Sequence, residues 1–474
     1  MIISLSVLVI TIIVSGTYAL YKTQLSKNIG VNTTTHGLAY YINYVKGTDI
    51  TAATLNPSTS YEGGASSDIE FWKKDDSYDI YGKIELTVNT IGTNLSNSPA
   101  LKYAVVNNGN VLKEGSLKGT TSGSKVTILK NLYLEQTKQI YTVYVWLDNS
   151  EELGNISNES LSISVDCTAS LQKEPTAADT IISLYTSAAK VTATNNSITY
   201  NTAPSVSLMN DRLGGTTTDL DGGNIRYYGA NPNNYIYFNC SDYSNQTSST
   251  CETWRIIGVF DGKLKITNPT KNDFYFPFDY DKNDDGTSTT YDSNWSTSTL
   301  QKLLNNGYYN NTIGEITYYF TDSSLRERNN TKNMSNIGLK NVDTRKLISS
   351  EKWYLGSNYG LQFANEVYVA ERSNISCEDC NYDVIWNGNI ALPYLSDFGY
   401  AGDFNACNVS TISSNCKGWM LFSSMNYWLL SIDTATTIMY YNFFYGNIQA
   451  NLSSVSYIVL PTLYLIPDIK IVGG

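Results

Sequence analysis

Histidine is almost absent from this sequence. His36 is the only histidine among 474 residues, and it lies near the N-terminus. A Ser-His-Asp or Cys-His relay uses histidine as its base, so such a relay would have to be built around this one position. Zinc sites that use several histidines are excluded outright.

Charged residues are also scarce, at 16% of the chain, and the formal net charge is −11. Affinity for nucleic acid comes mainly from neutralising phosphates, so we expect no nucleic-acid partner. The chain is rich instead in tyrosine, with 38 residues, and in long stretches of Asn, Ser and Thr. This composition predicts a β-rich surface protein.

An apolar run, MIISLSVLVITIIVSGTYAL, opens the chain. It has about the length that spans a bilayer, and Thr17 and Ala19 suit a signal-peptidase site after Ala19. No Lys or Arg precedes the run, whereas Lys22 and Lys27 follow it, which is opposite to the positive-inside rule. We predict that residues 1–27 are a signal peptide or a membrane anchor and that the protein is exported. The alternative is a buried helix of a cytosolic domain.

Residues 28–169 show short strand-like runs separated by turns. Asn108-Gly109, between alternating apolar residues, indicates a tight hairpin, and the regular strand spacing predicts an antiparallel β-sandwich. The segments SGTYALYK, YTVYVWLDNSEE and SLSISVDCTAS resemble the TasA/camelysin class of secreted bacterial matrix proteins. The resemblance implies a jelly-roll-like sandwich in this part of the chain.

Residues 170–222 break this pattern. Pro175 and Thr176 open a predicted helix, and Asp179 stands at capping-box spacing from Thr176. The apolar face of this helix consists of Ile181, Ile182, Leu184 and Tyr185. Glycine pairs follow, so we predict a linker that carries one short helix.

Residues 223–474 mix aromatic strands with helical patterns, which predicts an α+β domain. The runs NNYIYFNC and CETWRIIGVFDGKLKITN indicate three strands, the last two joined at Asp261-Gly262. The run NWSTSTLQKLLNNGYY predicts a helix capped at Ser296. Its inward residues are expected to be Leu300, Leu303 and Leu304.

Two of the seven cysteines, Cys240 and Cys251, flank a polar loop between two of these strands. Paired antiparallel positions come within disulfide range, so we expect a disulfide that pins the loop in an oxidising compartment.

The remaining cysteines suggest two further pairs by the same reasoning, Cys377 with Cys380 and Cys407 with Cys416, which leaves Cys167 over. The CEDC motif could instead serve redox chemistry or half a zinc site. Acidic residues between the two thiols disfavour a reactive thiolate, and a zinc ribbon needs two such motifs. A structural disulfide is therefore the favoured interpretation.

A second resemblance covers residues 223–474. The ordered segments YYGANPNNYIYFN, TWRIIGVF, NWSTSTLQKLLNNGYY, ALPYLSDFGYAGDF, GWMLFSSMNYWLLS and VLPTLYL are similar to the C-terminal domain of surface proteins from gut Firmicutes and Mollicutes. That module is similar to the C-type-lectin fold of formylglycine-generating enzymes and of the variable receptors of diversity-generating retroelements. The resemblance implies a rigid β scaffold with a variable face after YWLLS. Many relatives have Gly-Val-Arg-Pro before the last strand, but this chain has Ile458-Val459-Leu460-Pro461, so roles of that arginine do not carry over.

The candidate ligand-binding residues lie in the segment 432–457. Strand alternation puts Tyr440, Asn442 and Phe444 on one face, and we take this face as outward because Asn442 is cheaper to leave solvated. The full predicted set is Asp433, Thr436, Tyr440, Asn442, Phe444, Asn447, Asn451 and Tyr457. An ordinary hairpin with exposed polar residues is the alternative. Trp419 and Trp428 are expected in the core.

The segment DKNDDGTSTTYD matches the spacing of an EF-hand-like calcium loop. Its candidate ligands are Asp281, Asn283, Asp285 and Asp292, with Gly286 at the turn position. An acidic turn rich in Asp and Asn would look the same, so calcium is one of two interpretations and we expect no other cofactor.

Three functions remain open from the sequence. The first is an exported, cell-surface binding protein whose lectin-like domain recognises a host or bacterial glycan or protein. The second is a structural matrix or fibre subunit. The third, an enzyme of the formylglycine-generating type, is disfavoured because no nucleophile with an orienting base can be named, so we expect no catalysis.

Overall fold

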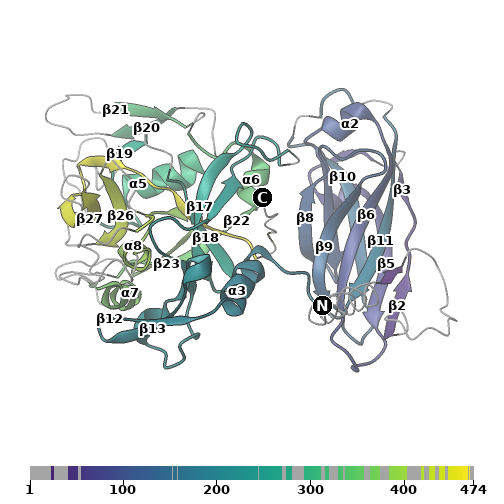
Figure 1. Ribbon diagram of the computed structural model, residues 1–474. Helices are drawn as coiled ribbons and strands as arrows, with labels where there is room; N and C mark the ends of the chain where they lie inside the picture. Colours follow the sequence, from purple (N-terminus) through teal and green to yellow (C-terminus); the bar gives the residue numbers. More distant parts are fainter. Residues whose placement is uncertain are drawn as a thin grey trace. The chain divides into compact units, whose positions relative to one another are not determined.

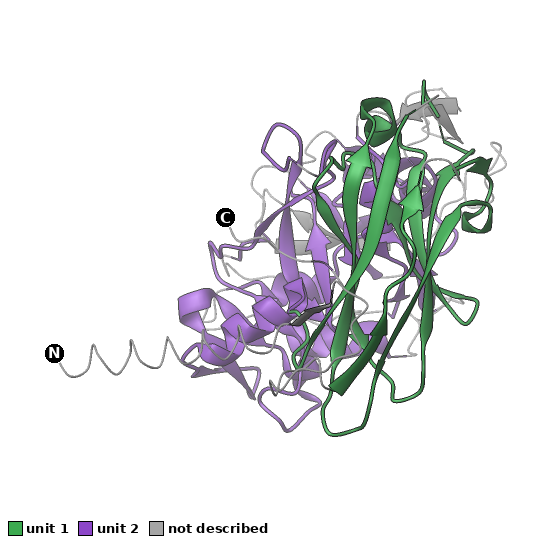
Figure 2. Ribbon diagram, turned by 90° about the vertical axis from the view of Figure 1, so that its right-hand side faces the viewer, with its two compact units in different colours: residues 1–174 green, residues 175–474 purple. Residues whose placement is uncertain are grey.

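The computed structural model describes residues 23–25, 41–51, 55–151, 153–156, 159–243, 245–269, 274–279, 293–310, 315–319, 329–334, 337–356, 363–373, 384–402, 418–420, 426–432, 437–442, 447–467 and 469. The chain divides into two compact units, Met1–Glu174 and Pro175–Gly474, which Figure 2 colours separately. Across these described ranges, no helix is long and apolar enough to cross a membrane. The apolar run of residues 1–20 lies outside them.

The first unit is built from two β-sheets (Figure 1). One has the strand order β1-β11-β6-β9, with β3 also on β11, and the other has the order β2-β5-β10-β7-β8, with β4 also on β10. The pairings are antiparallel apart from the short β4–β10 contact. The elements are β1 (Thr23–Leu25), β2 (Ile42–Val45), β3 (Ile50–Thr51), β4 (Pro57–Ser58), a 3-10 turn (Tyr61–Gly63), β5 (Ala65–Lys73), β6 (Tyr81–Ile91), α2 (Thr93–Asn97), β7 (Leu101–Asn107), β8 (Asn110–Ser116), β9 (Lys125–Tyr133), β10 (Ile140–Asp148) and β11 (Leu161–Ser170).

The two sheets share one hydrophobic core, which confirms the predicted sandwich. Alternate residues of β5 and β6 point inward, and Phe71, Ile84 and Leu86 are fully buried in a single cluster. Asn108 and Gly109 have φ values of 50° and 77°, the left-handed backbone that a two-residue hairpin between β7 and β8 requires. The predicted hairpin is therefore confirmed.

The first strand shifts one predicted boundary. Thr23–Leu25 pairs with Cys167–Ala169 of β11, so these residues belong to the sandwich. The N-terminal segment predicted over 1–27 therefore overlaps the first strand of the unit.

The second unit combines a large antiparallel sheet with smaller sheets and helices. The ten-stranded sheet has the order β12-β13-β14-β15-β17-β18-β30-β22, with β16 on β17 and β25 on β30. A five-stranded sheet has the order β19-β29-β26-β27-β28, and two strand pairs, β20-β21 and β23-β24, complete the described strands. This architecture confirms the β-rich, α+β prediction for the C-terminal part.

The strands of this unit are β12 (Val191–Asn195), β13 (Ile198–Ala203), β14 (Leu208–Asn210), β15 (Ile225–Tyr227), β16 (Tyr235–Phe238), β17 (Glu252–Phe260), β18 (Lys263–Thr267), β19 (Tyr275–Pro277), β20 (Glu315–Tyr319), β21 (Asn329–Asn333), β22 (Ile348–Ser349), β23 (Glu351–Tyr354), β24 (Ile385–Gly388), β25 (Ile390–Ala391), β26 (Tyr427–Ile432), β27 (Thr437–Asn442), β28 (Asn447–Leu452), β29 (Ser456–Ile458) and β30 (Thr462–Leu465). The helices are α3 (Ala177–Ser187), a 3-10 turn (Pro204–Val206), α4 (Arg212–Gly215), α5 (Thr299–Lys302), a π-helical turn (Leu303–Tyr308), α6 (Val342–Lys346), α7 (Ala364–Arg372) and α8 (Leu395–Tyr400).

The segment predicted as a linker, residues 170–222, is largely part of this unit. It contains the expected helix α3, whose capping box between Thr176 and Asp179 is present. Ile181 and Tyr185 are buried on its apolar face, whereas Leu184 is exposed. The same segment also supplies β12, β13 and β14 to the ten-stranded sheet, because its apolar strand residues outweigh the loop signal of the glycine pairs.

The turn between β17 and β18 lies where the sequence predicts it, whereas the start of α5 differs from the prediction. Asp261 and Gly262 have φ values of 53° and 73° and join β17 to β18, as expected. The predicted cap Ser296 is wrong by two residues, because Ser298 is the N-cap of α5 and its side chain accepts a hydrogen bond from the Gln301 backbone N–H. The expected inward residues, Leu300, Leu303 and Leu304, are all fully buried.

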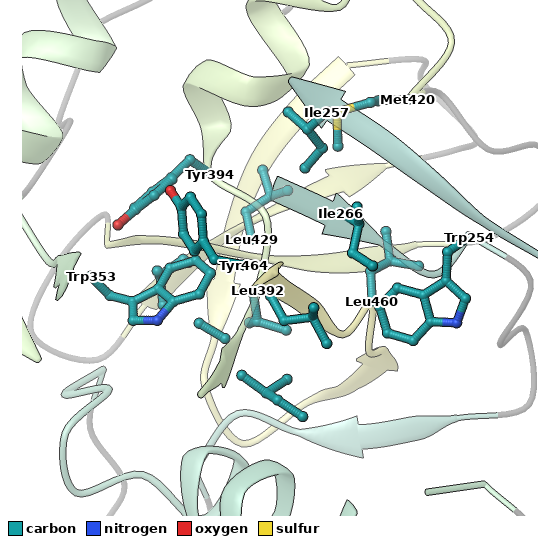
Figure 3. Close-up of a cluster of buried hydrophobic side chains, with 14 of the residues drawn as sticks. Trp254, Ile257, Ile266, Trp353, Leu392, Tyr394, Met420, Leu429, Leu460 and Tyr464 are labelled. Carbon is teal, nitrogen blue, oxygen red and sulfur yellow. The ribbon is translucent and has the colours of Figure 1, made fainter. Parts of the chain in front are cut away.

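The main core of the second unit is aromatic as well as aliphatic (Figure 3). Trp353, Tyr394 and Tyr464 lie together, with ring centroids 6.0 Å apart for Trp353 and Tyr394 and 5.1 Å apart for Trp353 and Tyr464. Trp419 and Trp428 are buried, as predicted.

Candidate functional site

Asn451 and Tyr457 are the two predicted ligand-binding residues whose side chains the structure describes, and they are in contact. The amide of Asn451 donates a hydrogen bond of 2.6 Å to the Tyr457 hydroxyl oxygen. The ring of Tyr457 packs edge-on against Trp428, with centroids 4.7 Å apart. Trp428 is fully buried, and its indole N–H donates to the Phe276 carbonyl at 2.9 Å. Asn451 and Tyr457 are both half-buried. Because Tyr457 packs on the buried Trp428 and is bonded to Asn451, both side chains are held in place.

The backbone register relates three further predicted residues to this pair. In β27 and β28, Asn442 is opposite Asn447, Tyr440 is opposite Gln449, and the pairing continues to Asn451. Tyr440, Asn442 and Asn447 therefore occupy positions on the same face as Asn451, although their side chains lie outside the described part of the chain.

Burial along β26 bears on which face is outward. Trp428 is opposite Tyr440 in the register and fully buried, so the face of Tyr440 is covered at β26. That Tyr440 and Asn442 face outward stays a prediction.

Other predicted site residues lie outside the described residues. These are Asp433, Thr436 and Phe444 of the ligand set, Asp281, Asn283, Asp285 and Asp292 of the calcium loop, and Cys377, Cys380, Cys407 and Cys416 of the expected disulfides. Among the residues that the structure does describe, no group of three His, Cys, Asp or Glu side chains could hold a metal ion.

One disulfide is present in the described part of the chain. Cys240 and Cys251 are bonded, which confirms the predicted closure of the polar loop between β16 and β17. Cys167 is a free, fully buried thiol on β11. Burial, together with the charge of Asp166, raises the pKa of this thiol well above its ordinary value, so it stays protonated and unreactive.

A buried ionic network, which sequence reasoning missed, lies at the centre of the second unit. Arg226 on β15 donates from Nε to Asp211 at 2.6 Å and from Nη1 to Asp397 at 2.8 Å. Lys265 on β18 donates from Nζ to the other oxygen of Asp397 at 2.5 Å. The four side chains are at most 1% exposed, so the charges interact without competition from water.

Aromatic rings enclose the cations of this network. The guanidinium of Arg226 lies 4.6 Å from the ring centroid of Phe260 and 4.7 Å from that of Tyr400. The ammonium of Lys265 lies 4.2 Å from the ring of Tyr394. These cation–π contacts stabilise charges that have lost their hydration.

Glu371 extends the network to the five-stranded sheet. Its carboxylate accepts hydrogen bonds from the Ser396 hydroxyl at 2.5 Å, the Ser396 backbone N–H at 3.1 Å and the Ser431 hydroxyl at 3.0 Å. Because Ser431 is on β26, one carboxylate joins α7, α8 and that strand. Burial raises the pKa of Glu371, although Arg372 and the bonds from Ser396 oppose the change.

The two charges at the centre of the network both have altered pKa values. Burial lowers the pKa of Lys265 to about 8, although Asp397 opposes this change. Burial alone would raise the pKa of Asp397, but Lys265 and Arg226 together hold it below its ordinary value. A lysine with a lowered pKa can act as a nucleophile, but this one is fully buried and bonded to its counter-ion, so the arrangement suits a structural role.

No protein family matches the sequence, and no curated protein matches it. Two of the solved structures that match are the receptor-binding domain of botulinum neurotoxin mosaic serotype C/D and a mutant of HCR/D, each with 12% identity and a TM-score of 0.16. The first match covers 57% of this chain and 77% of that one, and the second covers 53% and 86%. Likeness at this level carries no argument about function.

Proposed function

We propose that this protein is an exported surface protein that binds a glycan or a protein without catalysing a reaction. In this proposal the lectin-like second unit presents the recognition face, the apolar run of residues 1–20 delivers the chain to the membrane or anchors it there, and the ligand belongs to a host or bacterial surface.

The contact between Asn451 and Tyr457 is the observation that carries the proposal. Tyrosine offers a rigid amphipathic ring and asparagine offers adaptable hydrogen bonds, a combination suited to recognition. Both side chains are partly accessible, and Trp428 beneath Tyr457 fixes the ring before any ligand arrives. A preorganised site of this kind loses little side-chain entropy on binding.

Two further observations support the proposal, one for an extracellular location and one for binding without catalysis. The bonded pair Cys240 and Cys251 fits an oxidising compartment. The buried ionic network, although it contains acids and bases, fits a scaffold better than a reaction centre, because its central carboxylate is occupied by Lys265 and Arg226.

A glycan array and a panel of surface proteins, both probed with the purified chain, test this proposal. We expect selective retention of at least one ligand, about tenfold weaker in Tyr457→Ala and less affected in Tyr457→Phe, which keeps the ring. Tyr78→Ala is the matched control, because Tyr78 is 44% exposed and lies in the first unit. A wild-type chain that retains no ligand, or a Tyr457→Ala variant that binds as tightly as the wild type, would refute the proposal.

A structural fibre subunit is a second candidate, favoured by the edge of the first unit. Strand β8 ends its sheet and exposes Val111 and Leu112, which are 44% and 40% accessible. An apolar edge strand can pair with another copy of the chain. Concentration-dependent filaments, seen by electron microscopy and lost in Leu112→Lys, would favour this candidate over a monomeric binding protein.

A further inference from the structure

Within the ten-stranded sheet, β16 and the first residues of β17 form an antiparallel ribbon that presents two tyrosines on one outward face. Tyr235 and Tyr237 are 52% and 42% exposed, and both lie on β16 two residues apart, so their rings share a face. The opposite face of the ribbon is buried, where Phe238 packs against Trp254 with ring centroids 5.0 Å apart. The ribbon therefore has a core side and an aromatic outer side.

A layered stack holds Tyr235 in place. The guanidinium of Arg255 lies 4.5 Å from the ring centroid of Tyr235 and 4.5 Å from that of Trp419. Arg255 donates to the Asn234 side-chain oxygen at 2.7 Å, to the Pro232 carbonyl at 3.0 Å and to the Trp419 carbonyl at 3.5 Å. The cation is only 7% exposed and each of its three nitrogens donates to a neighbouring oxygen, so Arg255 supports the ring and is itself covered.

The far end of the ribbon is also fixed. The disulfide between Cys240 and Cys251 closes the loop beyond β16. Between the strand and the disulfide, the side chain of Asn239 donates to the Gly338 carbonyl at 3.1 Å and accepts from the Lys340 backbone N–H at 2.7 Å. Both exposed rings are therefore mounted on a part of the chain that is ordered before binding.

We propose that Tyr235 and Tyr237 form a second binding platform, which takes the apolar ring face of a neutral oligosaccharide. Exposed tyrosine rings provide flat apolar surfaces, and their hydroxyls provide donors and acceptors for sugar hydroxyls. Thr253, opposite Tyr237 on β17, adds a half-buried hydroxyl to the same face.

Charge and area select this ligand class. An acidic glycan or peptide would require an exposed cation, but Arg255 is covered by Tyr235 and bonded internally. A protein partner would require about 800 Å² on this side of the interface, whereas two tyrosine side chains offer about 300–500 Å² even when fully covered. A small neutral ring fits both limits.

The two tyrosines lie on β16 of the ten-stranded sheet, whereas Asn451 and Tyr457 lie on β28 and β29 of the five-stranded sheet. The inference rests on the proposed binding function only in that the chain meets glycans, and it adds a ligand class and a second site. Its failure can be distinguished from failure of the proposed function, since the two sites have different variants.

The experiment uses the full chain on a printed array of neutral, sialylated and sulfated oligosaccharides, followed by calorimetric titration with the best-retained neutral one. Tyr235→Ala and Tyr237→Ala are compared with Tyr457→Ala and with the control Tyr78→Ala. We expect binding of the neutral oligosaccharide to fall by about tenfold in each single variant and beyond detection in the double variant. Tyr235→Phe and Tyr237→Phe, which keep the rings, should retain most of the affinity.

Folding is checked in every variant by the near-ultraviolet circular dichroism spectrum and by the bonded state of Cys240 and Cys251. Retention of acidic glycans only would overturn the inference. So would unchanged binding of the neutral oligosaccharide in the folded double variant, and if Tyr457→Ala then abolished that binding, the proposed function would stand without the second platform.

Discussion

Asp397→Asn should lower the free energy of unfolding of the second unit by about 3–5 kcal/mol, the range for breaking a buried ion pair from one side. In the wild type, one oxygen of Asp397 accepts from Arg226, and the other accepts from Lys265 and from the Tyr394 backbone N–H. The asparagine amide has only one acceptor oxygen. Its NH₂ group would therefore face either the Arg226 guanidinium or the Lys265 ammonium and the Tyr394 N–H, all of which are donors. It would also leave two buried cations with Asp211 as the nearest remaining counter-charge of Arg226.

Lys263, two residues before Lys265 on β18, provides a matched control. Lys263 forms an ion pair with Glu351, but the two side chains are 26% and 20% exposed. Glu351→Gln removes the same kind of charge from a pair that water can screen, so we expect a loss of about 0–1 kcal/mol. The contrast between the two variants isolates the effect of burial from the effect of losing a carboxylate.

Chemical denaturation followed by tryptophan fluorescence measures both losses, and Lys265→Met in the Asp397→Asn background tests the mechanism. In Asp397→Asn the Lys265 ammonium has lost its carboxylate partner. Replacing this lysine with methionine, an apolar side chain of similar length, should recover part of the lost stability. Equal losses for Asp397→Asn and Glu351→Gln would refute the reasoning, because they would show that burial of Asp397 adds nothing to the energy of the pair.

Two more predictions concern the disulfide and alkaline pH. Replacing Cys240 and Cys251 together with alanine should cost about 3 kcal/mol by the chain-entropy estimate, and a reductant should lower the melting temperature of the wild type more than that of the variant. Burial raises the pKa of Tyr200 and Tyr227 to about 12, so their contribution, up to about 3 kcal/mol each, is complete below pH 10 and is lost as pH rises further. Lys265 acts with the opposite sign, since its lowered pKa adds stability as pH rises from about 8. Unfolding free energies measured from pH 7 to 11 should therefore rise and then fall, and a monotonic decrease from pH 7 would contradict the assignment for Lys265.

Local chemistry made several features predictable from the sequence. The hairpin at Asn108-Gly109 requires left-handed φ values that these residues adopt readily, and the capping box of Thr176 and Asp179 is complete within four residues. The disulfide followed from two strands that flank a short loop.

The ionic network was not predictable in this way. Lys265 stands between Leu264 and Ile266 in a short strand, where alternation would place a lysine toward solvent, yet the residue is fully buried. Its partner Asp397 is 132 residues away in the sequence, and 171 residues separate Asp397 from Arg226. A charged residue reveals its counter-ion only when the sheet brings distant segments together, and no local pattern contains that information.

The strand order of the second unit has a consequence for how the protein is made. The first unit is continuous in the chain, so it can fold while the ribosome is still translating the rest. In the large sheet, however, β30 lies between β18 and β22, although it is the last of these strands to be synthesised. Until β30 is synthesised, β18 and β22 therefore each lack their partner strand. A product truncated before Thr462 would leave these two strand edges unpaired and open to proteases and aggregation.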